Sequence, residues 1–153
     1  MNRPSYILIL AAVLSFCAAI FQAIIAVVPA WSAAFGATDA LVSNPSVLLT
    51  SGILVALLLV IFGFYGLSGA GVIRRLPLLR PGLLVIGLLY SLVGINFIFQ
   101  LLALLGILPS AGPIPLPIVL VSFGALVAGL AYLIRLAVSW KRLSTRPALA
   151  MTS

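Results

Sequence analysis

The chain contains no histidine, and Asp39 and Cys17 are its only acidic residue and its only cysteine. A single cysteine excludes a disulfide framework within the chain. Without histidine, clustered acids or clustered thiols, the usual sets of metal ligands are excluded as well. One aspartate cannot supply both an acid and a base, and a serine or tyrosine nucleophile would have no evident base to activate it. The sequence therefore predicts a non-enzymatic protein without a metal or a cofactor.

Charged residues of either sign are equally scarce. They make up 6% of the 153 residues, whereas hydrophobic residues make up 65% and the mean hydropathy is +1.42. A soluble domain carries roughly 25% charged residues, because its surface must be solvated by water. The composition excludes a soluble globular fold. It predicts an all-α polytopic membrane protein with a single transmembrane domain over residues 1–153.

Four apolar segments are long enough to cross a membrane as helices, which takes about 20 residues. Proline marks three of the starts at the first helical turn: Pro45, which follows Asn44 as a predicted N-cap, Pro81 and Pro117. The first segment is longer than the apolar region of a cleaved signal peptide, so we expect a retained helix. We predict a bundle of four transmembrane helices, at about residues 6–28, 45–67, 81–105 and 117–138.

The eight basic residues are distributed unevenly between the connections. Arg3 precedes the first segment, the second connection contains three arginines, and the other four basic residues lie at or beyond the end of the fourth segment. Basic residues collect in cytoplasmic loops, so both termini are predicted to be cytoplasmic. Attraction to anionic headgroups then explains the net charge of +7 without a nucleic acid. The predicted headgroup contacts are Arg74, Arg75, Arg80, Arg135, Lys141 and Arg142.

Small residues form stripes along the predicted helices. Lipid gives helices no hydrophobic reason to associate, so close contact between backbones depends on small side chains. On the first segment this stripe consists of Ser15, Ala19, Gln22 and Ala26. On the other three segments the predicted packing residues are Gly52, Ala56, Gly63, Gly87, Ser91, Gly94, Gly124, Ala128 and Gly129.

A layer of polar residues is predicted in the half of the membrane that lies away from the arginines. Its members are Gln22, Thr50, Ser51, Asn96, Gln100 and Ser122. At about 1.5 Å of rise per residue, all of them fall at a similar height. Two interpretations remain open. The side chains either fasten helices by hydrogen bonds or leave polar groups around a pocket that opens to the outside.

The segment 62–80 reads Phe-Gly-Phe-Tyr-Gly-Leu-Ser-Gly-Ala-Gly-Val-Ile-Arg-Arg-Leu-Pro-Leu-Leu-Arg. It resembles a segment in uncharacterised small four-helix inner-membrane proteins of proteobacteria. The resemblance covers the second apolar segment and the basic connection that follows it. It implies a location in the inner membrane, and it carries no activity that can be transferred.

These observations favour a protein that acts through helix contacts, as an accessory or assembly subunit of a membrane complex. Its expected partners are anionic lipid on the cytoplasmic side and another membrane protein or a second copy of itself. The alternative is a passive carrier or channel for a small solute or lipid, which would use the polar layer. A third hypothesis, an immunity protein against a membrane-active toxin, leaves no signature in a sequence.

Overall fold

The computed structural model describes residues 5–35, 37–109, 114 and 116–139, and all regular structure in these residues is helical. The helices are α1 (Tyr6–Val27), α2 (Pro29–Ala34), α3 (Asp39–Val42), α4 (Pro45–Ala70), α5 (Leu79–Leu104) and α6 (Leu116–Ser139). α1, α4, α5 and α6 are long and apolar enough to cross a membrane. The prediction of four long apolar helices is therefore confirmed, and no end differs from its predicted position by more than three residues.

Proline and glycine set several of the helix ends. Pro29 and Pro45 begin α2 and α4, at the position where a helix does not need the N–H group that proline lacks. Asn44 precedes α4 as predicted, but its side chain makes no capping hydrogen bond. α4 runs beyond its predicted end to Ala70. It stops where Gly71 takes the left-handed conformation with φ of 79°, which glycine adopts without steric cost.

The connection between α4 and α5 is held by Ser68. Its Oγ donates a hydrogen bond to the carbonyl of Arg74 at 3.2 Å and accepts one from the N–H of Leu76 at 2.8 Å. Leu78 then takes a left-handed φ of 54° and precedes the first residue of α5. As a result, α5 begins at Leu79, whereas the sequence pattern predicts its start two residues later, at Pro81.

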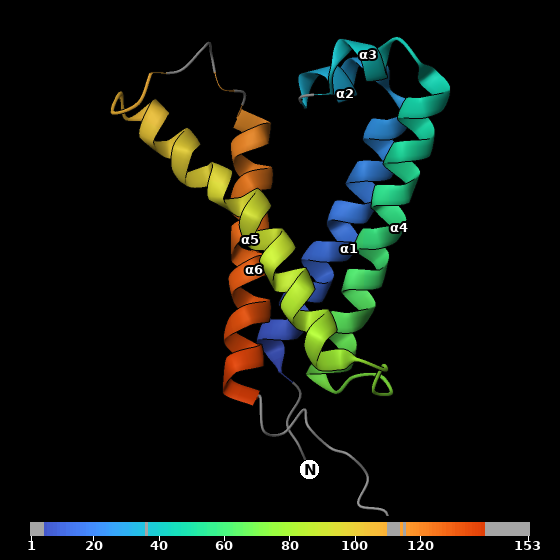
Figure 1. Cartoon of the computed structure of the whole chain (residues 1–153), viewed down its shortest axis with the longest axis vertical. Coiled ribbons are helices and arrows are strands. Elements are labelled where there is room, and N and C mark those ends of the chain that lie inside the picture. Colours follow the sequence, from blue (N-terminus) through green and yellow to red (C-terminus); the bar gives the residue numbers. More distant parts are fainter. Residues whose placement is uncertain (1–4, 36, 110–113, 115, 140–153) are drawn as a thin grey trace, which may run out of the picture.

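The four long helices form two pairs that splay apart as a V (Figure 1). α1 packs on α4 to form what we call the first arm, and α5 packs on α6 to form the second arm. The arms meet at the end where Arg74 and Arg75 lie, through contacts of α1 with α6 and of α4 with α5. We call this the basic end and the opposite end the far end. The predicted bundle of four helices is thus closed at the basic end and open at the far end.

Buried side chains gather where the two arms meet. Leu8 of α1, Leu83 of α5 and Tyr132 of α6 have no exposed surface, and Phe62 of α4 belongs to the same core. Outside this core most side chains of the long helices are exposed, since the buried share of their apolar spans is 28% to 33%. Such a surface is typical of a protein surrounded by hydrocarbon, where apolar side chains gain nothing from being hidden.

The connection between α1 and α4 folds over the far end of the first arm as α2 and α3, which the sequence pattern did not predict (Figure 1). The buried Ser32 of α2 donates its hydroxyl hydrogen to the carbonyl of Ile25 in α1, at 2.7 Å. Phe35 places its ring edge-on against Phe21, with centroids 5.0 Å apart. These contacts fix the connection onto α1, and we call α2 and α3 together the cap.

Candidate functional site

Most of the predicted packing residues lie at close contacts between helices. Gly52, Ala56, Gly63, Gly87, Gly94, Ala128 and Gly129 are buried, and Ser91 is half-buried. A Cβ atom on Gly52 would collide with Ala26, and a Cβ on Gly94 would collide with the backbone of Leu126. Gly124 differs, because a Cβ there would meet nothing within 4 Å in the part of the chain that the structure describes. The close contact that the sequence predicts at Gly124 is therefore absent from the structure.

A cluster of hydroxyl groups joins all four long helices where the arms meet. The Oη of Tyr90 in α5 donates to the Oγ of Ser15 in α1 at 2.8 Å, and Ser15 donates to the carbonyl of Ala11 at 2.9 Å. The Oη of Tyr132 in α6 lies 3.3 Å from the Oγ of Ser15 and donates to the carbonyl of Phe62 in α4 at 2.9 Å. We call Ser15, Tyr90 and Tyr132 the hydroxyl cluster. Its members satisfy one another inside an apolar core, where an unpaired hydroxyl would be costly.

The sequence pattern does not predict this cluster. Ser15 is predicted only as part of a stripe of small residues, and no role is predicted for the tyrosines. One signal was present, because tyrosines of membrane proteins concentrate at the membrane–water interface. Tyr90 lies 11 residues into α5, about 17 Å along the helix, which is far from either end. A tyrosine so deep in an apolar segment indicates a buried partner for its hydroxyl.

The three amides of the predicted polar layer do not meet in the structure. Gln22 lies on the first arm, and it takes part in no side-chain hydrogen bond within the described ranges. On the second arm the exposed Asn96 donates to the carbonyl of Val93 in its own helix at 3.1 Å. Gln100 donates across to the Oγ of Ser122 in α6 at 3.2 Å. The splaying of the arms thus divides the predicted layer into two parts, and one of its amides fastens two helices.

A cavity of about 340 Å³ lies below the cap, between the far ends of α1 and α4. Its polar lining residues are Gln22 from α1, Ser32 from α2 and Ser51 from α4. The remaining lining residues are apolar, and no charged side chain lines the cavity. Thr50, the neighbouring member of the predicted polar layer, is exposed and does not line it. The cavity therefore combines an apolar wall with one amide and two hydroxyl groups.

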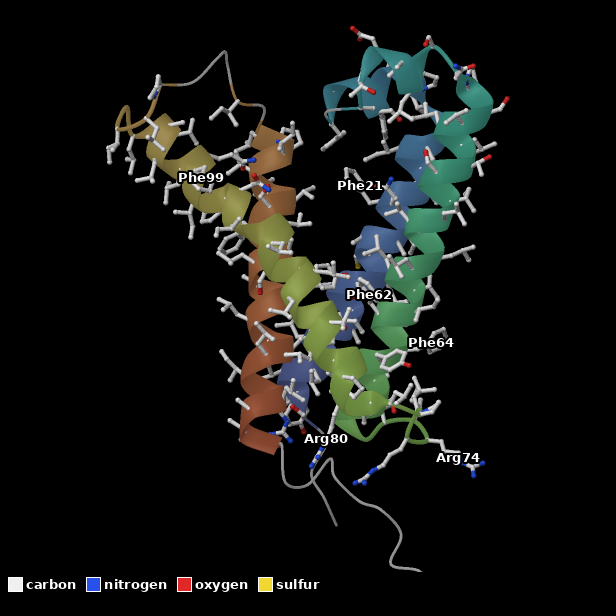
Figure 2. All side chains as sticks on the ribbon, in the orientation of Figure 1. Phe21, Phe62, Phe64, Arg74, Arg80 and Phe99 are labelled. Carbon is white, nitrogen blue, oxygen red and sulfur yellow. The ribbon has the colours of Figure 1, made fainter. Side chains whose placement is uncertain are left out.

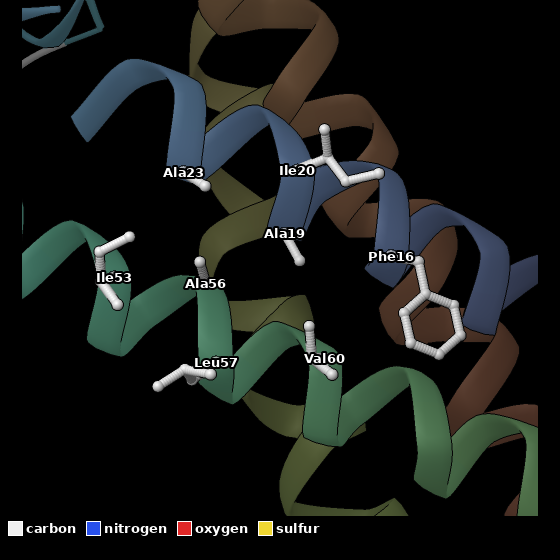
Figure 3. A pocket seen from close by; sticks show the side chains of 8 residues that line it. All are labelled: Phe16, Ala19, Ile20, Ala23, Ile53, Ala56, Leu57 and Val60. Atoms are coloured by element: carbon white, nitrogen blue, oxygen red, sulfur yellow. The ribbon is translucent and has the colours of Figure 1, made fainter. Parts of the chain in front are cut away.

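A second cavity of about 340 Å³ is an apolar groove between α1 and α4 (Figure 3). The groove exists because Ala19, Ala23 and Ala56 have small side chains that do not fill the space between the helices. The larger side chains of Phe16 and Leu57 line its sides. No polar side chain lines this groove. It therefore offers shape and apolar surface only, which suits the hydrocarbon of a bilayer and selects no particular head group.

Four arginines lie at the basic end. Arg74 and Arg75 are exposed in the connection between α4 and α5, and Arg80 in the first turn of α5 is half-buried (Figure 2). Arg135 lies near the end of α6, and its Nε is buried without a hydrogen-bond partner among the residues that the structure describes. The predicted headgroup contacts Lys141 and Arg142 lie outside the described residues.

The described residues contain no group of three or more side chains suited to bind a metal ion. Cys17 is exposed on α1, and Asp39 lies in the first turn of α3. What the structure offers chemically is therefore helix surface, a small uncharged cavity and a group of arginines. Comparisons of the chain with known protein families, with curated proteins and with solved structures found no match.

Proposed function

We propose that this chain is a non-enzymatic inner-membrane protein with four transmembrane helices and both termini in the cytoplasm. It acts through helix contacts, as an accessory or assembly subunit of a membrane complex. Its partner is another membrane protein or a second copy of the chain. The observation that carries this proposal is the exposed amide of Asn96, which lies on the apolar surface of the second arm.

The position of Asn96 makes an exposed amide costly. It lies 17 residues after Leu79, the first residue of α5, and this distance is about 25 Å along the helix. Since a bilayer has a hydrocarbon core of about 30 Å, the amide lies within that core. Its neighbours Ile95 and Phe99 are exposed apolar side chains. The hydrogen bond to Val93 uses one amide hydrogen. The other hydrogen and the amide oxygen need a partner, and a polar group on another helix would supply one.

The splayed far ends support the same function. In the far half the two arms lie apart (Figure 1), and exposed apolar side chains such as Leu101, Leu104 and Leu120 lie on the helix surfaces there. A closed bundle would use these surfaces for contacts within the chain. Because they are left open here, they offer a second membrane helix a large surface beside Asn96. Van der Waals packing and one interhelical hydrogen bond together suffice to associate helices in a membrane.

Cross-linking in native membranes tests this proposal. A photoreactive benzoylphenylalanine at Leu92, one turn from Asn96 on the same face of α5, should form an adduct with one protein of defined mass. Asn96→Leu should reduce the yield of that adduct about threefold to tenfold, because it removes the interhelical hydrogen bond.

Ile98 provides the control. It is exposed and lies two residues after Asn96, so it has almost the same height as Asn96 but lies on the opposite face of α5. The same probe at Ile98 should label lipid and no protein. If the probe at Leu92 also labels lipid alone, or if Asn96→Leu leaves the protein adduct unchanged, the proposed partner contact is wrong.

The basic end supports the proposed orientation. Its four arginines, Arg74, Arg75, Arg80 and Arg135, lie on one side of the molecule, whereas the cap at the far end carries Asp39 and no basic residue. Arginines extend toward anionic headgroups, and they are retained on the cytoplasmic side during insertion. α1 begins at this end and α6 ends there, so the first and last described helices meet the same side of the molecule (Figure 1).

Reporter fusions test the orientation. Green fluorescent protein and alkaline phosphatase should each be fused after Arg75 and after Ser110, a residue outside the described ranges. We expect fluorescence with the fusion after Arg75 and phosphatase activity with the fusion after Ser110, because each reporter functions on one side of the membrane only. Fluorescence after Ser110, or phosphatase activity after Arg75, would show that the orientation is wrong.

A further inference from the structure

The cavity below the cap is a built feature of the fold. α2 is anchored by the buried hydroxyl of Ser32, which donates to Ile25 at 2.7 Å, and by the edge-on contact of Phe35 with Phe21. The N–H of Ala37 donates to the carbonyl of Ser32 at 2.9 Å, which holds the chain as it leaves α2. Each of these contacts orders backbone over the far ends of α1 and α4. The cavity is therefore a partly open hollow lined by α1, the cap and α4.

The polar groups of the cavity are available to a ligand. The hydroxyl hydrogen of Ser32 is donated to Ile25, and that of Ser51 is donated to Leu48. Each serine oxygen can therefore only accept a further hydrogen bond. Gln22 is half-buried and lines the cavity, and its amide makes no side-chain hydrogen bond to any residue that the structure describes. A group that both donates and accepts hydrogen bonds would satisfy the amide and a serine oxygen together.

The rest of the lining determines the remainder of the ligand. Apolar side chains such as Leu41, Leu48 and Val55 form most of the wall, and no charged group lies among the lining residues. An ionised ligand would lose its hydration there without gaining a counter-charge, so it is excluded. A volume of about 340 Å³ is at the low end for small-molecule sites. At about 30 Å³ per water-sized group, the cavity holds roughly ten non-hydrogen atoms.

We propose that the cavity below the cap binds a small uncharged amphiphile, whose apolar body carries one hydroxyl group that hydrogen-bonds Gln22. This site lies on the first arm, whereas the proposed partner contact of Asn96 lies on the second. Either one can therefore fail without the other.

An eight-carbon alcohol that carries a photoreactive diazirine is a probe of the right size and chemistry. With the full chain in liposomes, the probe should label residues of the cavity wall such as Ile25 and Val55, and excess octanol should suppress this labelling. The matched probe is the same diazirine-bearing chain without its hydroxyl group. It should label the cavity about fivefold less, because it cannot bond to the amide.

Two variants locate the effect at Gln22. Gln22→Leu should reduce labelling by the alcohol about fivefold and leave labelling by the hydroxyl-free probe unchanged. Gln100→Leu is the control, since this glutamine is bonded to Ser122 on the other arm, and it should leave the labelling of the cavity unchanged. Leu41→Trp keeps the amide but fills the cavity, so it should abolish cavity labelling by both probes.

The comparison of the two probes on the unaltered chain needs no variant, so the proposal remains testable if Gln22→Leu does not fold. Equal labelling by both probes would overturn it, because the hydroxyl group would then contribute nothing. Labelling spread evenly along the exposed faces of α1 and α4 would also overturn it. That pattern would show the alcohol dissolved in the bilayer rather than bound below the cap.

Discussion

Replacing Gly129 with leucine is expected to separate α5 from α6 and to lower the free energy of unfolding by about 3 kcal/mol. A Cβ at this residue would lie 2.7 Å from the backbone nitrogen of Ser91 and 3.1 Å from the carbonyl oxygen of Gly87. These are backbone atoms of the neighbouring helix, so no change of a side-chain rotamer can relieve the overlap. The two helices would have to move apart, and they would lose the van der Waals contacts that hold the second arm together.

Gly124 supplies a matched control on the same helix. A Cβ there meets nothing within 4 Å of the described chain, so Gly124→Leu should change the free energy of unfolding by no more than about 0.5 kcal/mol. Both variants lose the same glycine flexibility and gain the same side chain. Unfolding by sodium dodecyl sulfate in mixed micelles, followed by circular dichroism, measures the difference. Equal stability of the two variants would show that the contact at Gly129 does not exist.

Gly124 and Gly129 also show how far helix periodicity predicts contacts. The spacing of small residues correctly indicates that α6 presents a small-residue face. It cannot decide where along that face a neighbouring helix comes close: Ala128 and Gly129 are buried, whereas a Cβ on Gly124, one turn earlier, meets nothing within 4 Å of the described chain. That depends on how α6 rotates against α5 and α1, and larger side chains decide it: Tyr132 is completely buried on the α1 side of the helix.

The length and start of the four long helices were predictable because hydrocarbon thickness and proline stereochemistry act locally along the chain. The cap was not predictable in this way. α2 and α3 have six and four residues, and such short helices have little stability of their own. They depend on contacts such as those of Ser32 and Phe35 with α1. These contacts join residues that only the folded first arm brings together.

The polar layer was predicted only from the height of each residue along its own helix. That height does not tell how far apart two residues on different helices lie in the plane of the membrane. Gln22 and Gln100 each lie toward the far end of their helix, as the residue count requires. The arms diverge toward that end, so Gln22 lines the cavity below the cap, whereas Gln100 donates to Ser122 of its own arm. Where the arms converge, side chains of all four long helices meet. There the structure has the hydroxyl cluster that the sequence did not reveal.

The hydroxyl cluster should contribute more to stability than its four hydrogen-bonded contacts would separately. Tyr132 is completely buried, and its Oη donates to the carbonyl of Phe62. This contact depends on the missing side chain of Gly66, because a Cβ there would lie 2.7 Å from the Oη of Tyr132. Tyr132 Oη also lies 3.3 Å from the Oγ of Ser15, and either hydroxyl can donate to the other in place of its backbone carbonyl. Ser15 in turn accepts the hydrogen of Tyr90. Removing one hydroxyl therefore leaves a buried neighbour without its partner, and burial makes such a group costly.

We therefore expect Tyr132→Phe to lower the free energy of unfolding by about 1 to 2 kcal/mol, and Tyr132→Ala by about 3 to 5 kcal/mol because it also leaves a cavity. Ser15→Ala should resemble Tyr132→Phe. The double variant should lose about 1 kcal/mol less than the sum of the two, since the same contact is removed twice. Tyr65→Phe is the control, because its hydroxyl donates to the carbonyl of Pro77 at 3.3 Å at the exposed basic end, away from the hydroxyl cluster. Losses from Ser15→Ala and Tyr132→Phe that add fully, or a loss from Tyr65→Phe as large as that from Tyr132→Phe, would mean that the cluster does not act as a unit. The arms would then be held together by apolar packing alone.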